Sequence, residues 1–167
     1  MTYLVRIRLS QRIILTATAL LILTACTVEP DSAEAKLLAL IEQAEVAAEA
    51  GDFGELRQLI SQNYSDNAGR DKAALAGILR FYLLHHQSIH LLTRVQTLSL
   101  PAPDVAQASL LIAMAGRPMV SAEEAADFRA DAYRLEIEFS GENDGHWKVS
   151  SVRWRRAKLS DLLNNVS

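Results

Sequence analysis

The side chains best suited to acid–base chemistry lie near the middle of the chain. Tyr64 and Asp66 stand two residues apart, so a phenol hydroxyl and a carboxylate could act together as hydrogen-bond donor and proton acceptor. The competing interpretation is structural, because residues 63–70 are rich in Ser, Asp, Asn and Gly and are typical of a loop. In that interpretation Asp66 caps a turn and Tyr64 fills the interior. The sequence favours the structural interpretation and leaves the catalytic one open.

Three of the four histidines form a cluster, at His85, His86 and His90. His86 and His90 have the i, i+4 spacing of a metal-binding pair, but only if a helix continues through residue 90. The residues from Ser88 onward have a β pattern instead, and no carboxylate lies nearby in the sequence to complete a metal site. We therefore predict neither a metal nor a cofactor here, and expect histidines that end a helix beside its last carbonyl groups.

Charged residues also gather in two C-terminal segments. Glu136 and Glu138 alternate with apolar residues, which is typical of the solvated face of a half-buried strand. Residues 153–156 carry three arginines around Trp154 and could form a patch for an anionic ligand or a membrane surface. The alternative, which the sequence favours, is a solvated strand end whose arginines pair across strands with the two glutamates.

These side chains must be positioned by the elements that the hydrophobic pattern predicts. A first helix begins after Asp31, whose spacing to Glu34 is that of a capping box, and it ends at Gly51. Asp52 opens a short second helix, and Asp71 caps a third helix that ends near His85 or His86. The first helix has an apolar face at helical spacing, made of Leu37, Leu40, Ile41, Ala44 and Ala48.

From Ser88 the pattern changes to alternation and to β-branched residues. This change predicts four strands, at residues 89–100, 105–116, 133–139 and 147–156. The second strand presents one apolar face, made of Ala106, Ala108, Leu110, Ile112 and Met114. Three helices followed by four strands predict an α+β fold, in which three N-terminal helices pack against a curved, mainly antiparallel four-stranded sheet.

Short motifs in this order carry a resemblance. They are Gly51-Asp52-Phe53, Tyr64-Ser65-Asp66, His86-Gln87-Ser88-Ile89, Gly145-His146-Trp147-Lys148-Val149 and Arg153-Trp154-Arg155. Together with the element order they resemble the nuclear transport factor 2-like superfamily in its bacterial branch. The resemblance implies a cystatin-like cone with a pocket between sheet and helices. Some members are enzymes, such as ketosteroid isomerase, and others only bind ligands or proteins, so the fold leaves the function open.

The resemblance makes eight residues candidates for the pocket of the cone. They are Tyr64, Asp66, Tyr82, His90, Leu110, Ile112, Met114 and Trp147. A lyase or isomerase of the ketosteroid isomerase type would use Asp66 as base and Tyr64 as donor, with His85 or His90 assisting. Because the apolar face of the second strand carries no carboxylate, we instead expect a non-catalytic domain that binds a small apolar ligand or an envelope protein. A homodimer formed through the sheet is a further expectation.

The only cysteine, Cys26, follows a segment with the features of an export signal. Three arginines precede an apolar run at residues 13–23, which is shorter than the roughly 20 residues of a membrane-spanning helix. The ending Leu23-Thr24-Ala25-Cys26 resembles the lipobox of bacterial lipoproteins, which implies a lipid on the Cys26 thiol and removal of residues 1–25. Thr27, in place of an aspartate, favours the periplasmic face of the outer membrane of a Gram-negative bacterium.

This interpretation divides the chain and restricts its partners. We expect a lipidated tether at residues 26–31, a domain at residues 32–158 and a C-terminal tail at residues 159–167. Without residues 1–25, the chain has 14 basic and 20 acidic residues and a net charge of −6, which argues against a nucleic-acid partner. A lipidated Cys26 leaves no thiol for a disulfide, a zinc site or a nucleophile. The membrane, through the lipid, is the partner that the sequence predicts.

Overall fold

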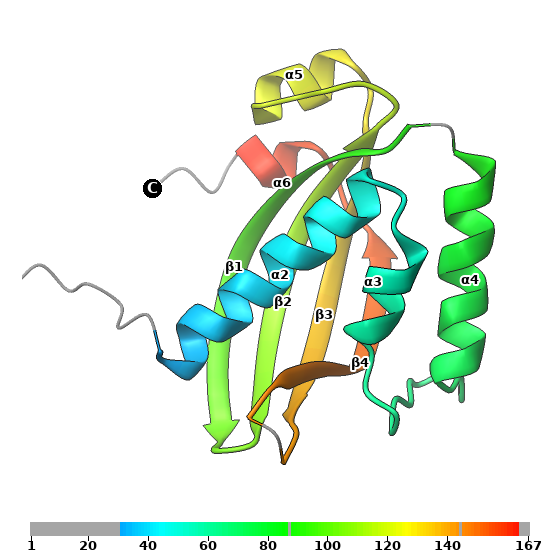
Figure 1. Cartoon of the computed structure of the whole chain (residues 1–167). Coiled ribbons are helices and arrows are strands. Elements are labelled where there is room, and N and C mark those ends of the chain that lie inside the picture. Colours follow the sequence, from blue (N-terminus) through cyan, green and yellow to red (C-terminus); the bar gives the residue numbers. More distant parts are fainter. Residues whose placement is uncertain (1–30, 87, 144, 164–167) are drawn as a thin grey trace, which may run out of the picture. The chain divides into compact units, whose positions relative to one another are not determined.

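The computed structural model describes residues 31–86, 88–143 and 145–163. For residue 163 it describes the backbone and not the side chain. The predictions for the signal peptide, Cys26 and residues 27–30 lie outside these residues. The described part belongs to a compact unit that begins at Asp31, and its elements are labelled in Figure 1. In chain order they are α2 (Ala33–Glu49), α3 (Phe53–Gln58), α4 (Lys72–His85), β1 (His90–Ala102), β2 (Val105–Ala115), α5 (Ala122–Asp127), β3 (Asp131–Gly141), β4 (Trp147–Arg156) and α6 (Ser160–Leu163). No helix in this part of the chain is long and apolar enough to cross a membrane.

Side-chain caps fix where the three N-terminal helices begin. Asp52 and Asp71 cap α3 and α4 as predicted, since each carboxylate accepts a hydrogen bond from the backbone N–H three residues on, at 2.9 and 2.8 Å. The predicted cap of α2, Asp31, is wrong. Ser32 takes that place and accepts from the N–H of Ala35 at 3.1 Å. The capping residue directly precedes the first helical residue, so the helical start at residue 33 selects the serine.

The four strands form one antiparallel sheet in the order β1-β2-β3-β4, which confirms the predicted α+β fold. Register shifts interrupt the pairing between Val95 and Thr97 in β1 and between Glu138 and Phe139 in β3. Such irregularities bend a strand and increase its twist. Figure 1 shows the resulting curvature, with α2 lying across the concave face and α3 between α2 and α4.

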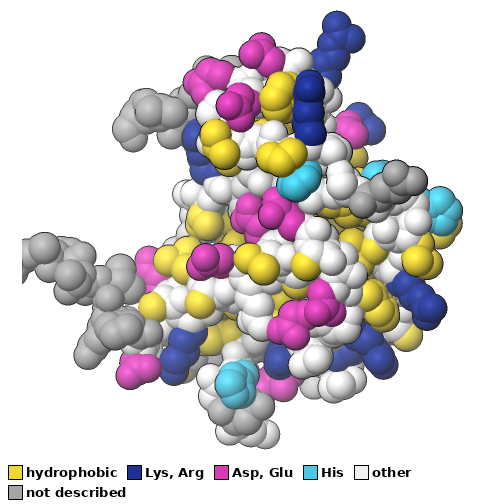
Figure 2. All heavy atoms as spheres, turned by 45° about the horizontal axis from the view of Figure 1, so that its top comes forward, with side chains coloured by type: hydrophobic (Ala, Val, Ile, Leu, Met, Phe, Trp, Pro, Cys, Tyr) yellow, Lys and Arg dark blue, Asp and Glu magenta, His cyan; other side chains and the backbone are white. Residues whose placement is uncertain are grey.

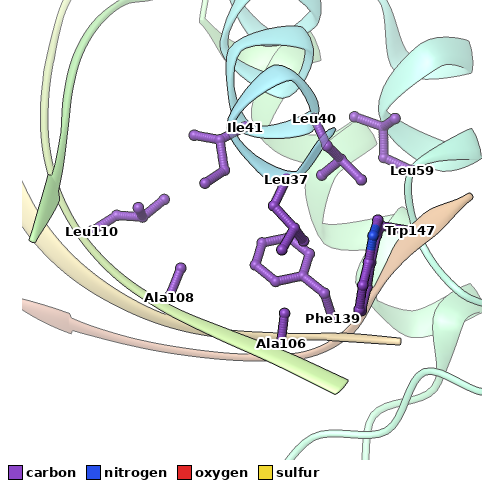
Figure 3. Close-up of a cluster of buried hydrophobic side chains, with 9 residues drawn as sticks. All are labelled: Leu37, Leu40, Ile41, Leu59, Ala106, Ala108, Leu110, Phe139 and Trp147. Atoms are coloured by element: carbon purple, nitrogen blue, oxygen red, sulfur yellow. The ribbon is translucent and has the colours of Figure 1, made fainter. Parts of the chain in front are cut away.

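The main core lies between α2 and the concave face of the sheet (Figure 3). Its buried side chains are Leu37, Leu40, Ile41, Leu59, Ala106, Ala108, Leu110, Phe139 and Trp147. Leu37, Leu40 and Ile41 point from α2 towards the sheet, as the predicted apolar face requires. Phe139 is fully buried beneath them. The even-numbered face of β2 therefore turns towards the helix, as predicted.

The opposite face of β2 is also buried, and the sequence pattern did not predict this. Neighbouring residues of a strand point to opposite faces, so Leu111 and Ala113 face away from α2. Both are fully buried because α5, through Ala125, and α6, through Leu162, pack against this outer face. Helix α6 lies in the segment predicted to be a polar tail, so the packed core extends beyond residue 158.

Candidate functional site

The candidate pocket residues do not line one common pocket. Leu110 and Ile112 line a cavity of about 140 Å³ between α2 and the sheet, here named the cone cavity. Tyr82 and Met114 line a second cavity of about 430 Å³, here named the end cavity. Trp147 is buried in the main core cluster and lines neither of them.

The cone cavity has an almost entirely apolar wall. Its lining is Leu40, Ile41, Ala44, Glu45, Leu91, Thr93, Leu110, Ile112, Leu135, Ile137, Phe139 and Val149. These residues come from α2 and from all four strands, so the curvature of the sheet creates the space. Within this lining, Glu45 is the one ionisable side chain and Thr93 the one hydroxyl. The cavity therefore offers apolar contact with a single polar position on its wall.

Glu45 is the group in the cone cavity that could transfer a proton. Its carboxyl group is half-buried, and burial raises its pKa above the usual range for a glutamic acid. Hydrogen bonds from the side chain and backbone of Thr93 oppose this rise, and the negative charges of Glu49 and Glu42 add to it. A carboxyl group with a raised pKa beside an apolar cavity has the form of a general acid or base.

The same carboxylate also has a structural task. β1 is an edge strand, and the carboxylate of Glu49 accepts a hydrogen bond from the backbone N–H of Leu91 at 2.7 Å. Glu45 accepts from the N–H of Thr93. Glu45 and Glu49 are four residues apart on the helix, a rise of about 6 Å. Leu91 and Thr93 are two residues apart on the strand, a rise of about 6.6 Å. Because the two spacings are similar, each glutamate can reach one of these two backbone N–H groups.

Sequence reasoning missed Glu45. Its position was a usable signal, because Glu45 follows Ile41 by four residues and so falls on the apolar face of α2. A charged residue in that place must find a partner or lie at the border of the core. The identity of the partner depended on the packing of α2 against β1, which the sequence pattern alone could not provide.

Tyr64 and Asp66 are brought together, as the functional hypothesis required, but they line neither the cone cavity nor the end cavity. The hydroxyl of Tyr64 donates to Oδ2 of Asp66 at 3.3 Å. The ring packs with Ile60 and Leu75, and burial raises the pKa of Tyr64 to about 12, assisted by the charge of Asp66. Tyr64 is therefore a neutral donor held inside the packed loop.

The carboxylate of Asp66 is the hydrogen-bonding centre of that loop. The side chain is 1% exposed, and burial alone would raise its pKa. The backbone N–H and the guanidinium of Arg70, with the N–H of Ala68, outweigh that effect and hold the pKa below its usual value. The guanidinium Nε lies 2.6 Å from Oδ2. An ionised carboxylate with these donors fits the predicted turn, and a catalytic role for it stays a prediction.

The histidines lie at the end of α4, as predicted. Nδ1 of His85 lies 2.7 Å from the carbonyl oxygen of Phe81, and Nδ1 of His86 lies 2.9 Å from that of Tyr82. His90 begins β1 and is half-buried, and it lines neither the cone cavity nor the end cavity. Across the described ranges, no three His, Cys, Asp or Glu side chains gather in a group that could hold a metal ion.

The glutamates of β3 face a polar groove of about 520 Å³ on the outer side of the sheet. Ser109 donates to Glu136 at 3.0 Å. Glu136 lies directly opposite Arg153 in the register of β3 and β4, but the ion pairs in the described residues are Arg70 with Asp66 and Arg156 with Asp131, so the predicted pairing of the arginines with Glu136 and Glu138 stays a prediction. The ring of Trp154 is covered by the guanidinium of Arg70, 4.4 Å from the ring centre. Two residues of the arginine-rich strand end therefore have partners within the domain, Trp154 with Arg70 and Arg156 with Asp131.

Comparisons with known proteins show the fold. A scan against protein-family models and a search of curated proteins find no match. Among solved structures, the chain is similar to a nuclear transport factor 2-like protein from Streptomyces avermitilis, named as a candidate dehydratase (TM-score 0.60, 17% identity, covering 78% of this chain and 99% of that one). It is also similar to a cystatin-like domain of unknown function from Nostoc punctiforme (TM-score 0.57, 15% identity, covering 79% of this chain and 80% of that one). A third similar structure is a ketosteroid isomerase-like protein from Erwinia carotovora atroseptica (TM-score 0.56, 10% identity, covering 79% of this chain and 99% of that one).

Proposed function

Because the chain has the nuclear transport factor 2-like fold, we propose that it is a lipid-anchored cell-envelope protein whose domain binds a small apolar molecule in the cone cavity without transforming it. The observation that carries this proposal is the lining of the cavity. Apolar side chains surround a volume of about 140 Å³, and the one carboxylate on its wall, Glu45, is bonded to the edge of β1. Tyr64, Asp66 and His85, the residues of the catalytic alternative, lie outside that lining.

The size of the cavity defines the ligand class. Dry cavities of about 150 Å³ lined by Leu, Ile and Phe bind benzene or xenon, and the cone cavity has a similar volume and lining. Transfer of apolar surface from water contributes roughly 25 cal/mol per Å². A molecule of about the size of benzene, or the apolar end of a longer one, therefore suits this space.

The first test fills the cavity from α2. Ala44 lines the cone cavity, whereas Ala39 is exposed on the same helix. We expect Ala44→Leu to remove the increase in Tm that benzene gives to the native full chain, and Ala39→Leu to retain it. The proposal fails if benzene gives no increase, or if Ala44→Leu responds like the native protein. Native mass spectrometry of protein purified from its own envelope would then identify the retained molecule.

A second candidate function is supported by the raised pKa of Glu45. In a lyase or isomerase of the ketosteroid isomerase type, a carboxylate removes a proton from carbon inside an apolar cavity, and one similar structure is named ketosteroid isomerase-like. This alternative requires the protein to exchange the α-protons of a small bound ketone with D₂O. Glu45→Gln should abolish the exchange and Glu42→Gln, on the exposed face of α2, should preserve it. Absence of exchange in the native protein favours the binding function.

The proposed anchor rests on the sequence at residues 23–26. Leu-Thr-Ala-Cys follows an apolar run, and the chain has no other cysteine. One acyl chain gives only marginal membrane binding, whereas several chains together hold a protein stably. An anchored domain with an apolar cavity is well placed to take a ligand that partitions into lipid.

A further inference from the structure

The end cavity contains a second combination of side chains that the proposed function does not use. It is lined by Tyr82, His86, Ser88, Ile89 and by residues 114–117 and 128–131. Apolar side chains, Met114 and Phe128 among them, form part of its floor, and two exposed arginines, Arg117 and Arg129, stand on its rim. The cavity lies where the end of α4, the start of β1 and the segment around α5 meet. Figure 2 turns this end forward, where Lys and Arg, Asp and Glu, and hydrophobic side chains lie side by side.

Neither Arg117 nor Arg129 forms an ion pair in the described part of the chain, so both guanidinium groups can pair with an anionic ligand. In the described part of the chain, neither guanidinium has a carboxylate within 4.0 Å, because the ion pairs found there are Arg70 with Asp66 and Arg156 with Asp131. Asp131 also lines the cavity, but its Oδ1 accepts a hydrogen bond from Arg156 at 3.3 Å. The rim therefore keeps an excess of positive charge in a domain that is acidic overall.

Arg117 is held in place by an aromatic ring. Its guanidinium carbon lies 3.5 Å from the centre of the Phe128 ring. A guanidinium over a ring face is attracted by the ring quadrupole and keeps its N–H groups free at the edges. The side chain is therefore already ordered before an anion arrives, which lowers the entropy lost on binding.

Arg129 occupies a backbone position that ordinarily belongs to glycine. It follows the C-cap of α5 with a φ of +53°. The N–H groups of Arg129 and Ala130 bond to the carbonyl groups of Ala126 and Ala125, which is the Schellman pattern. Glycine adopts this conformation without strain, and arginine does not. This helix end sets Arg129 on the cavity rim at a position where glycine would relieve the backbone.

The floor suits the apolar part of such a ligand. Met114 and Phe128 supply polarisable and aromatic surface, and the hydroxyl of Tyr82 lies 2.8 Å from Sδ of Met114. Burial raises the pKa of Tyr82, and the nearby Tyr133 and Asp131 raise it further, so the phenol stays neutral. A volume of about 430 Å³ lies within the range of ordinary ligand pockets.

We propose that the end cavity is a binding site, distinct from the cone cavity, for a small carboxylate with an apolar body. The carboxylate lies between Arg117 and Arg129, and the apolar body rests on Met114 beside the edge of the Phe128 ring, whose face Arg117 covers. Both guanidinium groups donate hydrogen bonds to the two carboxylate oxygens, and these charge-assisted bonds supply the selectivity for an anion.

The test compares benzoate with its neutral counterpart benzamide on the full chain in phosphatidylcholine nanodiscs, followed by saturation-transfer NMR. We expect saturable binding of benzoate and roughly tenfold weaker binding of benzamide, because hydrogen bonds to charged groups contribute the difference. Arg117→Gln and Arg129→Gln should each weaken benzoate binding roughly tenfold. Arg80→Gln, on the exposed side of α4, is the matched control and should leave the affinity unchanged.

Arg129→Gly separates binding from folding. Glycine relieves the backbone at this position, so the variant should have a higher Tm than the native protein and yet bind benzoate as weakly as Arg129→Gln. Absence of benzoate binding, equal binding of benzamide, or full binding by the two Gln variants would overturn the proposal. Binding that Ala44→Leu abolishes and Arg117→Gln does not would place benzoate in the cone cavity, and would also overturn it.

Discussion

The pKa values of two carboxyl groups in this domain are shifted in opposite directions because their surroundings differ. Glu45 is half-buried beside an apolar cavity and near two other glutamates, and its pKa is raised. The side chain of Asp66 is 1% exposed, but hydrogen bonds from Arg70 and Ala68 hold its pKa down. At the residue scale, a buried carboxylate is available for proton transfer only where it has few donors. This comparison favours Glu45 over Asp66 as the acid–base group of any catalytic alternative.

Glu45→Gln is expected to change the dependence of stability on pH. A folded-state pKa above the unfolded value means that the native protein loses stability as pH rises from the unfolded pKa through the folded one. Glutamine stays neutral, so the stability of the variant relative to the native protein should increase as pH rises towards 7. Below pH 4 this dependence on pH should disappear. Urea unfolding between pH 3 and pH 8 measures it.

Glu42→Gln is the control for this prediction. It removes the same charge from an exposed position on α2, so its stability relative to the native protein should vary less with pH. A stability difference for Glu45→Gln that is constant with pH, or one that falls as pH rises towards 7, would contradict the assignment of Glu45 as a carboxyl group with a raised pKa.

At the scale of elements, two short helices complete the fold on the outer face of the sheet. α5 and α6 have six and four residues, yet they bury Leu111 and Ala113 of β2. The N-terminal helices α2, α3 and α4 form the other layer. β2 is therefore covered on both faces at this end of the sheet, and α6 has an importance for stability that its length does not suggest.

Leu162→Ala is expected to lower the free energy of unfolding by about 2 kcal/mol. Leu162 is 1% exposed, and truncation of a buried leucine costs roughly 2–5 kcal/mol. The lower end of this range applies because a short helix near the end of the chain can adjust to the lost volume. Urea unfolding monitored by circular dichroism measures the change. Leu38→Ala, at a position 38% exposed on α2, should have the smaller effect, and equal effects would contradict the role given to α6.

Three helices and four strands were predicted from apolar spacing and capping residues, and they include α3, which has only six residues but a cap at Asp52. α5 was not predicted, and α6 lies in the segment predicted to be a polar tail. The even-numbered apolar face of β2 could be predicted from the sequence. The burial of Leu111 on the other face could not, because it depends on the packing of α5 and α6 against β2. The contact of Tyr64 with Asp66 was predictable from spacing. The position of Glu45 in the cone cavity was not, because it depends on how α2 docks on β1.

At the scale of the whole molecule, the proposed anchor and the proposed ligand support each other. Ser32 is six residues beyond Cys26, so at 3.3–3.6 Å per residue the connection reaches at most about 22 Å. A lipidated Cys26 would therefore keep the domain at the membrane surface. Apolar molecules concentrate in the bilayer, so the anchor would hold the cone cavity where the local concentration of the proposed ligand is high.

Cys26→Ser is the test at this scale. Without the thiol, neither lipid attachment nor the cleavage that follows it can occur, so the variant should accumulate as an uncleaved precursor that incorporates no labelled palmitate. Mass spectrometry of the membrane fraction measures both properties. Normal processing and release of the variant would show that residues 1–25 are an ordinary secretory signal and that the cysteine is incidental.

The contacts along the two borders of the sheet restrict how copies of this protein can assemble. Glu45 and Glu49 occupy the N–H groups of Thr93 and Leu91 on one border. On the other, Val149 exchanges hydrogen bonds with the chain at Leu59 and Ser61. Anchored proteins are crowded in two dimensions, where strand-to-strand fusion of neighbours would grow into open fibres. With these stretches already occupied, neighbouring copies cannot add a strand along them, and the expected homodimer through the sheet stays a prediction.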